Sequence, residues 1–144
     1  MEARRLKYQA IAAATIVAFI EGSLYYSPLM FGPMWMRLSG MNPHAKVSPW
    51  AIVAEIGRDL VLAYVVARLV ARLTDADWRS ATGLGLWLWL GFPLMLLSGS
   101  VLWQGASWKI GAIHAGDWFA KLLLVTAILG GWRGREPAAE SQVR

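Results

Sequence analysis

Four long apolar stretches constrain this chain more than any other feature of its sequence. They cover residues 8–26, 48–73, 80–103 and 109–132. A helix needs about 20 residues, each rising about 1.5 Å, to cross the hydrocarbon core of a bilayer. In that core every backbone N–H and C=O must be paired within the protein, and a helix pairs them locally. The sequence therefore predicts four transmembrane helices.

The composition agrees with a membrane protein. Hydrophobic residues make up 57% of the 144 residues and charged residues only 16%, whereas a soluble domain carries roughly 25% charged residues. The absence of cysteine excludes a disulfide-stabilised secreted scaffold, and the apolar content excludes a disordered chain. The net charge of +5 comes from bases that flank the apolar stretches without forming a basic stripe, so we expect no nucleic-acid partner.

The basic residues predict the orientation, because Lys and Arg accumulate in cytoplasmic flanks. One set of flanks contains eight bases: Arg4, Arg5, Lys7, Arg72, Arg79, Arg133, Arg135 and Arg144. The other set contains three: Arg37, Lys46 and Lys109. We therefore expect a multi-pass protein of a bacterial inner membrane with both termini in the cytoplasm. A signal peptide is not expected, because Glu21 interrupts the first stretch and no small-residue cleavage site follows.

The connection 27–47 is the only long one. Its glycines and prolines exclude a long helix, but several of its residues are apolar. We expect a short helix in the outer interface, or a cap folded over the mouth of the bundle. The complete expectation is an all-α, integral membrane four-helix bundle over residues 1–135, followed by a disordered tail at 136–144.

Small residues recur every four positions in two of the predicted helices. They are Ala10, Ala14, Ala18 and Gly22 in the first, and Ala63, Ala67 and Ala71 in the second. This spacing lets two helix backbones approach closely in lipid. In the third predicted helix, Pro93 should produce a kink, and we expect Trp87 and Trp89 to pack in the core.

Ionisable residues inside the predicted spans are the candidate site. They are Glu21 in the first helix, Glu55, Arg58 and Asp59 in the second, and His114, Asp117 and Lys121 in the fourth. Charges at membrane depth are costly and rarely face lipid. At about 1.5 Å per residue they lie about 8–18 Å below the outer helix ends, and on each helix they share an arc of at most about 100°. We expect them to meet in one interior cluster.

The acidic residues of this cluster outnumber the basic ones. Four carboxylates face two bases, so the cluster carries −2 if all are ionised and His114 is neutral. Carboxylates that take up protons, a bound cation or cationic ligand, or entering water would each relieve this excess. Alternatively, Arg58 with Asp59 or Glu55, and Lys121 with Asp117, form interhelical ion pairs that only set the helix register.

Three further segments carry a resemblance to a known family. They are the stretch EGSLYYSPLMFGPMWMRLSG from Glu21 to Gly40, the run GLWLWLGF from Gly85 to Phe92, and IHAGDWFAKLLLVTAILGGWR from Ile113 to Arg133. Together they resemble a family of small bacterial four-helix membrane proteins that is classed as a domain of unknown function. The matching elements are Tyr25-Tyr26-Ser27-Pro28 and the apolar-Gly-x-Trp-Arg end at 129–133. The resemblance implies the architecture and supplies no substrate or cofactor.

Three functions remain open. In the first, the cluster transports a proton, a small cation or a cationic solute, with Glu55 and Asp117 binding, Arg58 and Lys121 setting affinity and His114 relaying protons. A dimer or trimer is then expected, because four helices enclose little volume. In the second, the protein binds a lipid or amphiphile, or scaffolds a complex, without transport. The third, an enzyme using Asp117 and His114 as acid and base, has little support because motifs for hydrolysis, zinc, phosphate or haem binding are absent.

Overall fold

The computed structural model describes residues 7–73 and 77–133, and this part of the chain is helical and contains no strand. The tail expected at 136–144 lies outside the described residues. The helices are α1 (Tyr8–Tyr25), α2 (Gly32–Leu38), α3 (Pro49–Val70), α4 (Trp78–Gly91), α5 (Pro93–Gln104) and α6 (Trp108–Arg133).

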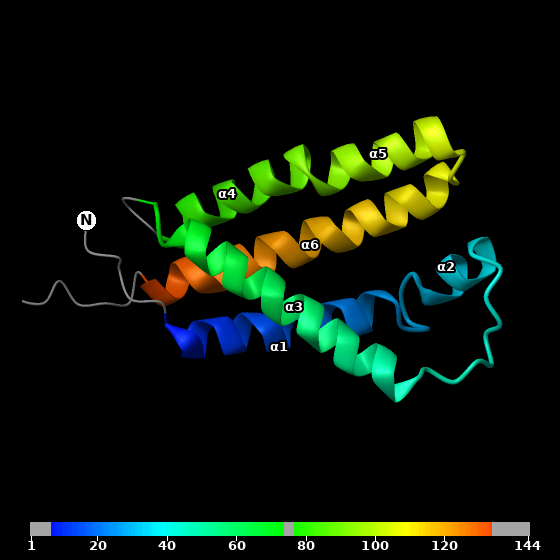
Figure 1. Cartoon of the computed structure of the whole chain (residues 1–144), viewed down its shortest axis with the longest axis horizontal. Helices are drawn as coiled ribbons and strands as arrows, with labels where there is room; N and C mark the ends of the chain where they lie inside the picture. Colours follow the sequence, from blue (N-terminus) through cyan, green and yellow to red (C-terminus); the bar gives the residue numbers. More distant parts are fainter. Residues whose placement is uncertain (1–6, 74–76, 134–144) are drawn as a thin grey trace, which may run out of the picture.

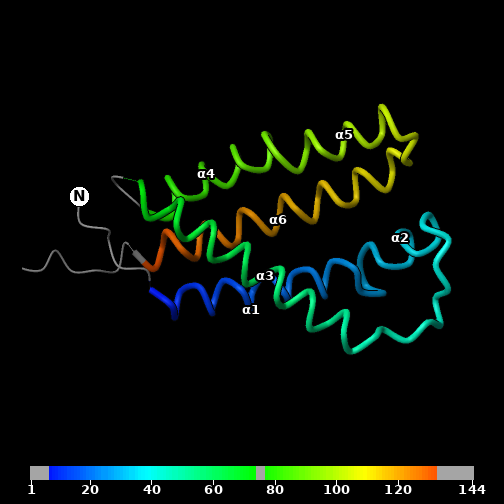
Figure 2. The backbone as a smooth tube through the Cα atoms, in the orientation of Figure 1, coloured from blue at the N-terminus to red at the C-terminus, as the bar shows by residue number. Residues whose placement is uncertain are grey.

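The longest helix, α6, organises the fold (Figures 1 and 2). Helices α4 and α5 follow one another along one side of α6, and α1 packs on another side. Helix α3 crosses α1 obliquely, packs against it and makes a less extensive contact with α6. The start of α1, the end of α3, the start of α4 and the end of α6 lie at one end of the molecule, while α2 and the α5–α6 turn lie at the other.

The small-residue stripes form the centre of the core. Ala14 and Ala18 of α1 and Ala63 of α3 are completely buried, and the core also contains Ala10 and Ala67. Because these side chains end at Cβ, the backbones of α1 and α3 can approach closely. The predicted close packing through four-residue spacing is therefore confirmed for these two helices.

A second close contact, between α4 and α6, was not anticipated from the sequence. Ala81 and Gly85 of α4 face Thr126 and Gly130 of α6. A Cβ atom built on Gly85 would lie 2.5 Å from the Thr126 Oγ1 atom, and one on Gly130 would collide with Ala81. Both pairs of residues are spaced by four, which is the signal that could have predicted the contact.

Three of the expected spans are long and apolar enough to cross a membrane. They are Tyr8–Tyr25, Trp78–Gln104 and Trp108–Trp132. Helix α3 has sufficient length, with 22 residues, but it is not among the three because Glu55, Arg58 and Asp59 lie close together in it. Length and composition thus support three of the four predicted spans. Helix α3 could cross a membrane only if its charged side chains faced the interior of the protein.

Two details of the third predicted span differ from expectation. Pro93 breaks the helix rather than only kinking it, because α4 ends at Gly91 and α5 begins at Pro93. Phe92 between them adopts φ −119° and ψ −76°. Trp87 is 72% exposed, so the expectation that it packs in the core is wrong. Trp89 is half-buried, and its Nε1–H donates to the carbonyl oxygen of Ala115 at 2.8 Å.

The connection after α1 contains the expected short helix, α2. Ser27 begins a turn in which Phe31 N–H donates to the carbonyl of Tyr25, so the chain folds back on the end of α1. The ring of Tyr25 stacks on Phe31 at 4.7 Å, and that of Tyr26 meets Trp35 edge-on at 5.2 Å. These ring contacts hold α2 against the end of α1, near α6.

Candidate functional site

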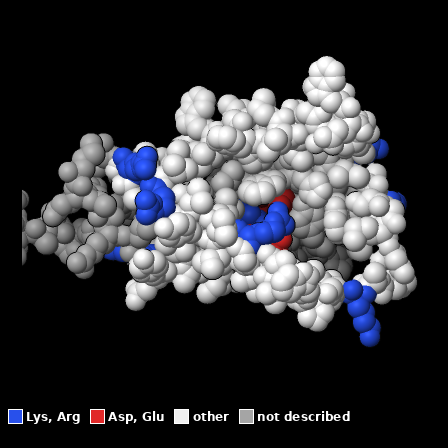
Figure 3. Space-filling model, in the orientation of Figure 1, with Lys and Arg blue, Asp and Glu red and all other residues white. Residues whose placement is uncertain are grey.

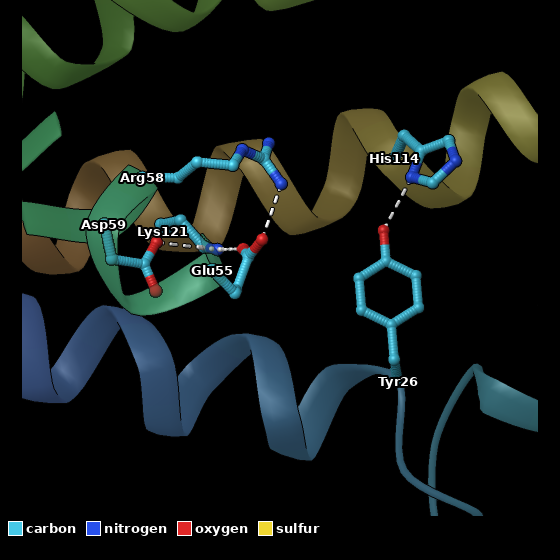
Figure 4. A network of polar contacts seen from close by, with 6 residues as sticks. All are labelled: Tyr26, Glu55, Arg58, Asp59, His114 and Lys121. Atoms are coloured by element: carbon cyan, nitrogen blue, oxygen red, sulfur yellow. Dashed lines mark hydrogen bonds and ion pairs between the residues drawn. The ribbon is translucent and has the colours of Figure 1, made fainter. Parts of the chain in front are cut away.

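Lys121 lies where α1, α3 and α6 meet. Its side chain projects from α6, and its Nζ atom lies 3.3 Å from Asp59 Oδ1 and 3.6 Å from Glu55 Oε1 on α3 (Figure 4). A Cβ atom on Gly22 of α1 would lie only 3.2 Å from the same Nζ. The ammonium group is therefore enclosed by three helices, and the small residue at position 22 makes room for it.

The burial of this ion pair is asymmetric. The side chains of Lys121 and Asp59 are 6% and 3% exposed, whereas that of Glu55 is 37% exposed. Glu55 also accepts from Arg58 Nη1 at 2.5 Å, and Arg58 itself is mostly exposed. The pairing within the cluster thus runs from the exposed Arg58 through Glu55 to the buried Lys121 and Asp59.

Three carboxylates keep oxygen atoms that are buried without a hydrogen-bond partner in the described residues. These atoms are both oxygens of Glu21, Oδ2 of Asp59 and Oδ1 of Asp117. Asp117 is 7% exposed and has no ion-pair partner in the described part of the chain. A buried polar group without a partner is costly, so these atoms are the unsatisfied part of the cluster.

A cavity of about 850 Å³ adjoins these carboxylates, between α3 and α6. Its polar lining comprises Tyr26, Glu55, Arg58, Asp59, His114, Asp117 and Lys121. Its apolar lining comprises Ala54, Gly57, Val61, Leu62, Val65 and Trp118. Figure 3 shows the hollow in the middle of one face of the molecule, with basic atoms over acidic ones, while the other charged groups visible on this face are basic and lie towards its two ends.

A smaller cavity of about 230 Å³ lies on the α1 side of α3. Its lining includes Phe19, Gly22 and Ala51, and it shares three residues with the larger cavity: Tyr26, Glu55 and Asp59. The ion pair of Asp59, Glu55 and Lys121 therefore forms part of the partition between two hollows.

The end of α1 is attached to α6 beside the larger cavity by two tyrosines. The hydroxyl of Tyr25 donates to the carbonyl oxygen of Ile113 at 2.9 Å, and the hydroxyl of Tyr26 shares a 2.6 Å hydrogen bond with Nδ1 of His114. A side chain at Gly116 would collide with the Tyr25 hydroxyl. The Tyr25-Tyr26 element thus fixes the end of α1 against α6 at the edge of the larger cavity.

The structure brings six of the seven candidate residues to the larger cavity. The exception is Glu21, which lines neither cavity although its charge interacts with those of Asp117 and Lys121. The expected pair of Arg58 with Glu55 is present, although both residues lie on α3 and the pair does not join two helices. Lys121 pairs with Asp59 and Glu55 of α3 rather than with Asp117, the expected partner. The sequence did not single out Trp118, or Tyr26 as a partner of His114. Among the described residues, no three His, Asp or Glu side chains are arranged to hold a metal ion.

Comparisons with known proteins give one match. Residues 9–130 match the model of a family described as "Protein of unknown function (DUF1761)". No curated protein and no solved structure matches the chain significantly.

Proposed function

The chain belongs to the DUF1761 family of unknown function, and we propose that it is a multi-pass membrane protein that transports a positively charged species through its acidic cavity. The transported species is a proton, a small cation or a cationic solute. The bilayer surrounds the apolar helices, and Glu55, Asp59 and Asp117 provide the binding charge.

One observation supports this proposal: the carboxylate of Asp117 is buried, lines the cavity and keeps one oxygen without a hydrogen-bond partner among the described residues. Acidic groups inside membrane proteins commonly mark pathways of cations or protons. Lys121 already neutralises part of the charge of Asp59 and Glu55, so Asp117 is the carboxylate left to receive a positive species. His114 lines the same cavity, and its Nδ1 atom shares a hydrogen bond with the hydroxyl of Tyr26.

The proposed topology has four spans, namely α1, α3, α4 with α5, and α6, with both termini in the cytoplasm of a bacterial cell. Because the chain has no cysteine, single cysteines report the topology directly. Lys46→Cys should react with a membrane-impermeant maleimide added outside intact spheroplasts, and Arg79→Cys should react only after the membrane is opened. The reverse pattern contradicts the proposed orientation.

A flux assay tests transport. The purified protein is placed in sealed vesicles that contain a pH-sensitive dye, and a proton or cation gradient is applied. The native protein should produce flux well above that of empty vesicles. Asp117→Asn should abolish the flux while the variant keeps its elution volume and thermal unfolding temperature, because it removes the charge and preserves the shape.

Asp77→Asn is the matched control for this assay. It makes the same carboxylate-to-amide change at the exposed start of α4, away from both cavities, and should leave the flux unchanged. Flux from neither the native protein nor the control, or equal flux from Asp117→Asn, contradicts transport.

The size of the cavity favours one alternative, in which the protein binds a lipid or amphiphile without transporting it. A volume of about 850 Å³ is in the range of small-molecule sites. This alternative predicts no flux but a lipid or ligand that copurifies with the protein and is absent from a variant with a filled cavity. We also propose a homo-oligomer, which light scattering on the detergent-solubilised protein would detect.

A further inference from the structure

The cavity has more room and more apolar surface than a proton or a metal ion needs. Its volume of about 850 Å³ falls in the range of roughly 300–1,000 Å³ that holds drug-sized molecules. A channel for a small inorganic ion would instead need closely placed oxygen ligands around a narrow path. The volume therefore points to an organic ligand.

One wall of the cavity is apolar. Val61, Leu62 and Val65 of α3 line it together with Trp118 of α6. Trp118 also packs against the core of the protein, and this packing restrains the position of its ring. Aliphatic side chains favour the burial of an apolar body, and an aromatic face attracts a cation. This wall suits the hydrocarbon or aromatic part of a ligand.

The other part of the cavity that a ligand would meet is a negatively charged group, the carboxylate of Asp117. This residue is 7% exposed, lines the cavity and keeps Oδ1 without a partner in the described residues. Asp59 is likewise buried, but its other oxygen is already bound to Lys121. A ligand with one positive charge can approach Asp117 without displacing Lys121.

The positive charge of Arg58, which also lines the cavity, does not exclude a positively charged ligand. Its side chain is 67% exposed, and Glu55 holds its guanidinium group at 2.5 Å. The charge of Arg58 is thus largely matched by Glu55, and its exposed position allows it to move aside when a ligand enters. Arg58 and Lys121 are both engaged by carboxylates of α3, so Asp117 is the cavity carboxylate that takes part in no ion pair of the described residues.

One drug-sized cavity thus combines an apolar wall with a buried carboxylate that has one oxygen unpartnered in the described part of the chain. From this juxtaposition we propose that the ligand is a lipophilic organic monocation. Its charged group lies at Asp117, and its apolar body lies against Trp118, Leu62 and Val65. This inference rests on the proposed function and names the substrate class of that transport site.

Binding of tetraphenylphosphonium to the full-length protein in nanodiscs tests the inference, with empty nanodiscs as the blank. Equilibrium dialysis of the radiolabelled cation should give saturable binding. Tetramethylammonium lacks the apolar body and should not compete, and the anion tetraphenylborate, of similar shape, should not bind. Asp117→Asn should weaken binding at least tenfold.

A pair of variants distinguishes the effect of filling the cavity from the effect of placing a large side chain elsewhere on α3. Val65→Trp places a large ring in the cavity and should also weaken binding at least tenfold. Val53→Trp is the matched control, because Val53 is exposed on the same helix and lines neither cavity, and it should bind as the native protein does. Because Val65→Trp does not alter the ion pairs, it remains informative if Asp117→Asn fails to fold.

The inference is overturned by the absence of saturable binding, by equal binding of tetraphenylborate, or by native affinity in both Asp117→Asn and Val65→Trp. Equal loss in Val53→Trp and Val65→Trp also overturns it. The two proposals fail separately. Tetraphenylphosphonium binding without flux of any cation contradicts transport and leaves the ligand class standing, whereas Asp117-dependent proton flux without tetraphenylphosphonium binding contradicts the ligand class alone.

Discussion

The hydroxyl of Tyr26 and the Nδ1 atom of His114 lie 2.6 Å apart, and this contact joins the end of α1 to α6 at the edge of the larger cavity. Tyr26 lines both cavities, and Figure 4 shows its ring reaching across to the imidazole. The hydrogen bond therefore holds the end of α1, where the connection to α2 begins, against the α6 wall of the candidate site.

Removing this hydrogen bond should destabilise the protein modestly. Tyr26→Phe keeps the ring contact with Trp35 but leaves His114 Nδ1 without its partner, and we expect a loss of about 1 kcal/mol in the free energy of unfolding. Denaturation by SDS in mixed micelles measures it. Tyr8→Phe, at an exposed position, serves as the control, and equal stability of the two variants would contradict the structural role of the Tyr26 hydroxyl.

Because its ammonium group is buried in an ion pair, Lys121 should contribute strongly to the free energy of unfolding. Lys121→Met removes the ammonium that faces Asp59 and leaves a buried carboxylate uncompensated, so we expect a loss of about 3–5 kcal/mol. Arg58→Met is the comparison, because Arg58 is mostly exposed and should cost less than about 1 kcal/mol. The same denaturation assay ranks the two variants.

A second-site change checks the cause of this loss. Adding Asp59→Asn to Lys121→Met removes the uncompensated charge and should recover part of the lost stability. If the double variant is less stable than Lys121→Met, the loss arises from packing of the lysine side chain rather than from the buried charge.

The close contact of α4 with α6 predicts that Gly85 tolerates no side chain. Gly85→Ala places a Cβ atom 2.5 Å from Thr126 Oγ1 and 3.0 Å from the Leu122 carbonyl oxygen, and overpacking of this kind costs about 1–3 kcal/mol. Gly83→Ala is the control on the same helix. Nothing lies within 4 Å of its Cβ, so it should be neutral or gain up to about 1 kcal/mol from helix propensity.

Asp77 lies just before the candidate span formed by α4 and α5, and its hydrogen bonds predict that the stability of the protein depends on pH. Its side chain accepts from the backbone N–H of Ser80 at 2.8 Å, while Ser80 Oγ accepts from the Asp77 N–H. These hydrogen bonds hold the pKa of Asp77 below its usual value of 3.8. Since the folded-state pKa is the lower one, this stabilisation is complete above pH 3.8 and is lost as the pH falls through the folded-state pKa.

Two variants at this position test the helix cap. Asp77→Ala should lower the thermal unfolding temperature at neutral pH, because the first turn of α4 loses its acceptor. Asp77→Asn keeps an acceptor and should remain near the native temperature but lose the part of the acid sensitivity that comes from this residue. An unchanged unfolding temperature in Asp77→Ala would contradict the capping role.

The residues at the helix contacts were partly predictable from the spacing of small residues along the sequence. Four-residue repeats identified Ala14, Ala18 and Ala63 as contact residues, because small side chains on one helix face favour close approach wherever the partner lies. The tryptophans of α4 were not separable in this way. Trp87 is exposed and Trp89 is half-buried. The face of α4 that meets α6 carries Ala81 and Gly85, and their four-residue spacing does not say which helix they contact.

The sequence alone determined the helices and the existence of an acidic excess, because backbone hydrogen bonding within an apolar segment is local and charge is a property of composition. Periodicity also placed the charged residues on single helix faces. It could not say which helix each face meets. The oblique crossing of α3 decided that Lys121 binds Asp59 and Glu55 rather than its own-helix neighbour Asp117. Only the tertiary structure therefore placed Asp117 beside a cavity and outside the ion pairs of residues 7–73 and 77–133, because the rotation and crossing of helices set distances between residues that are far apart in the chain.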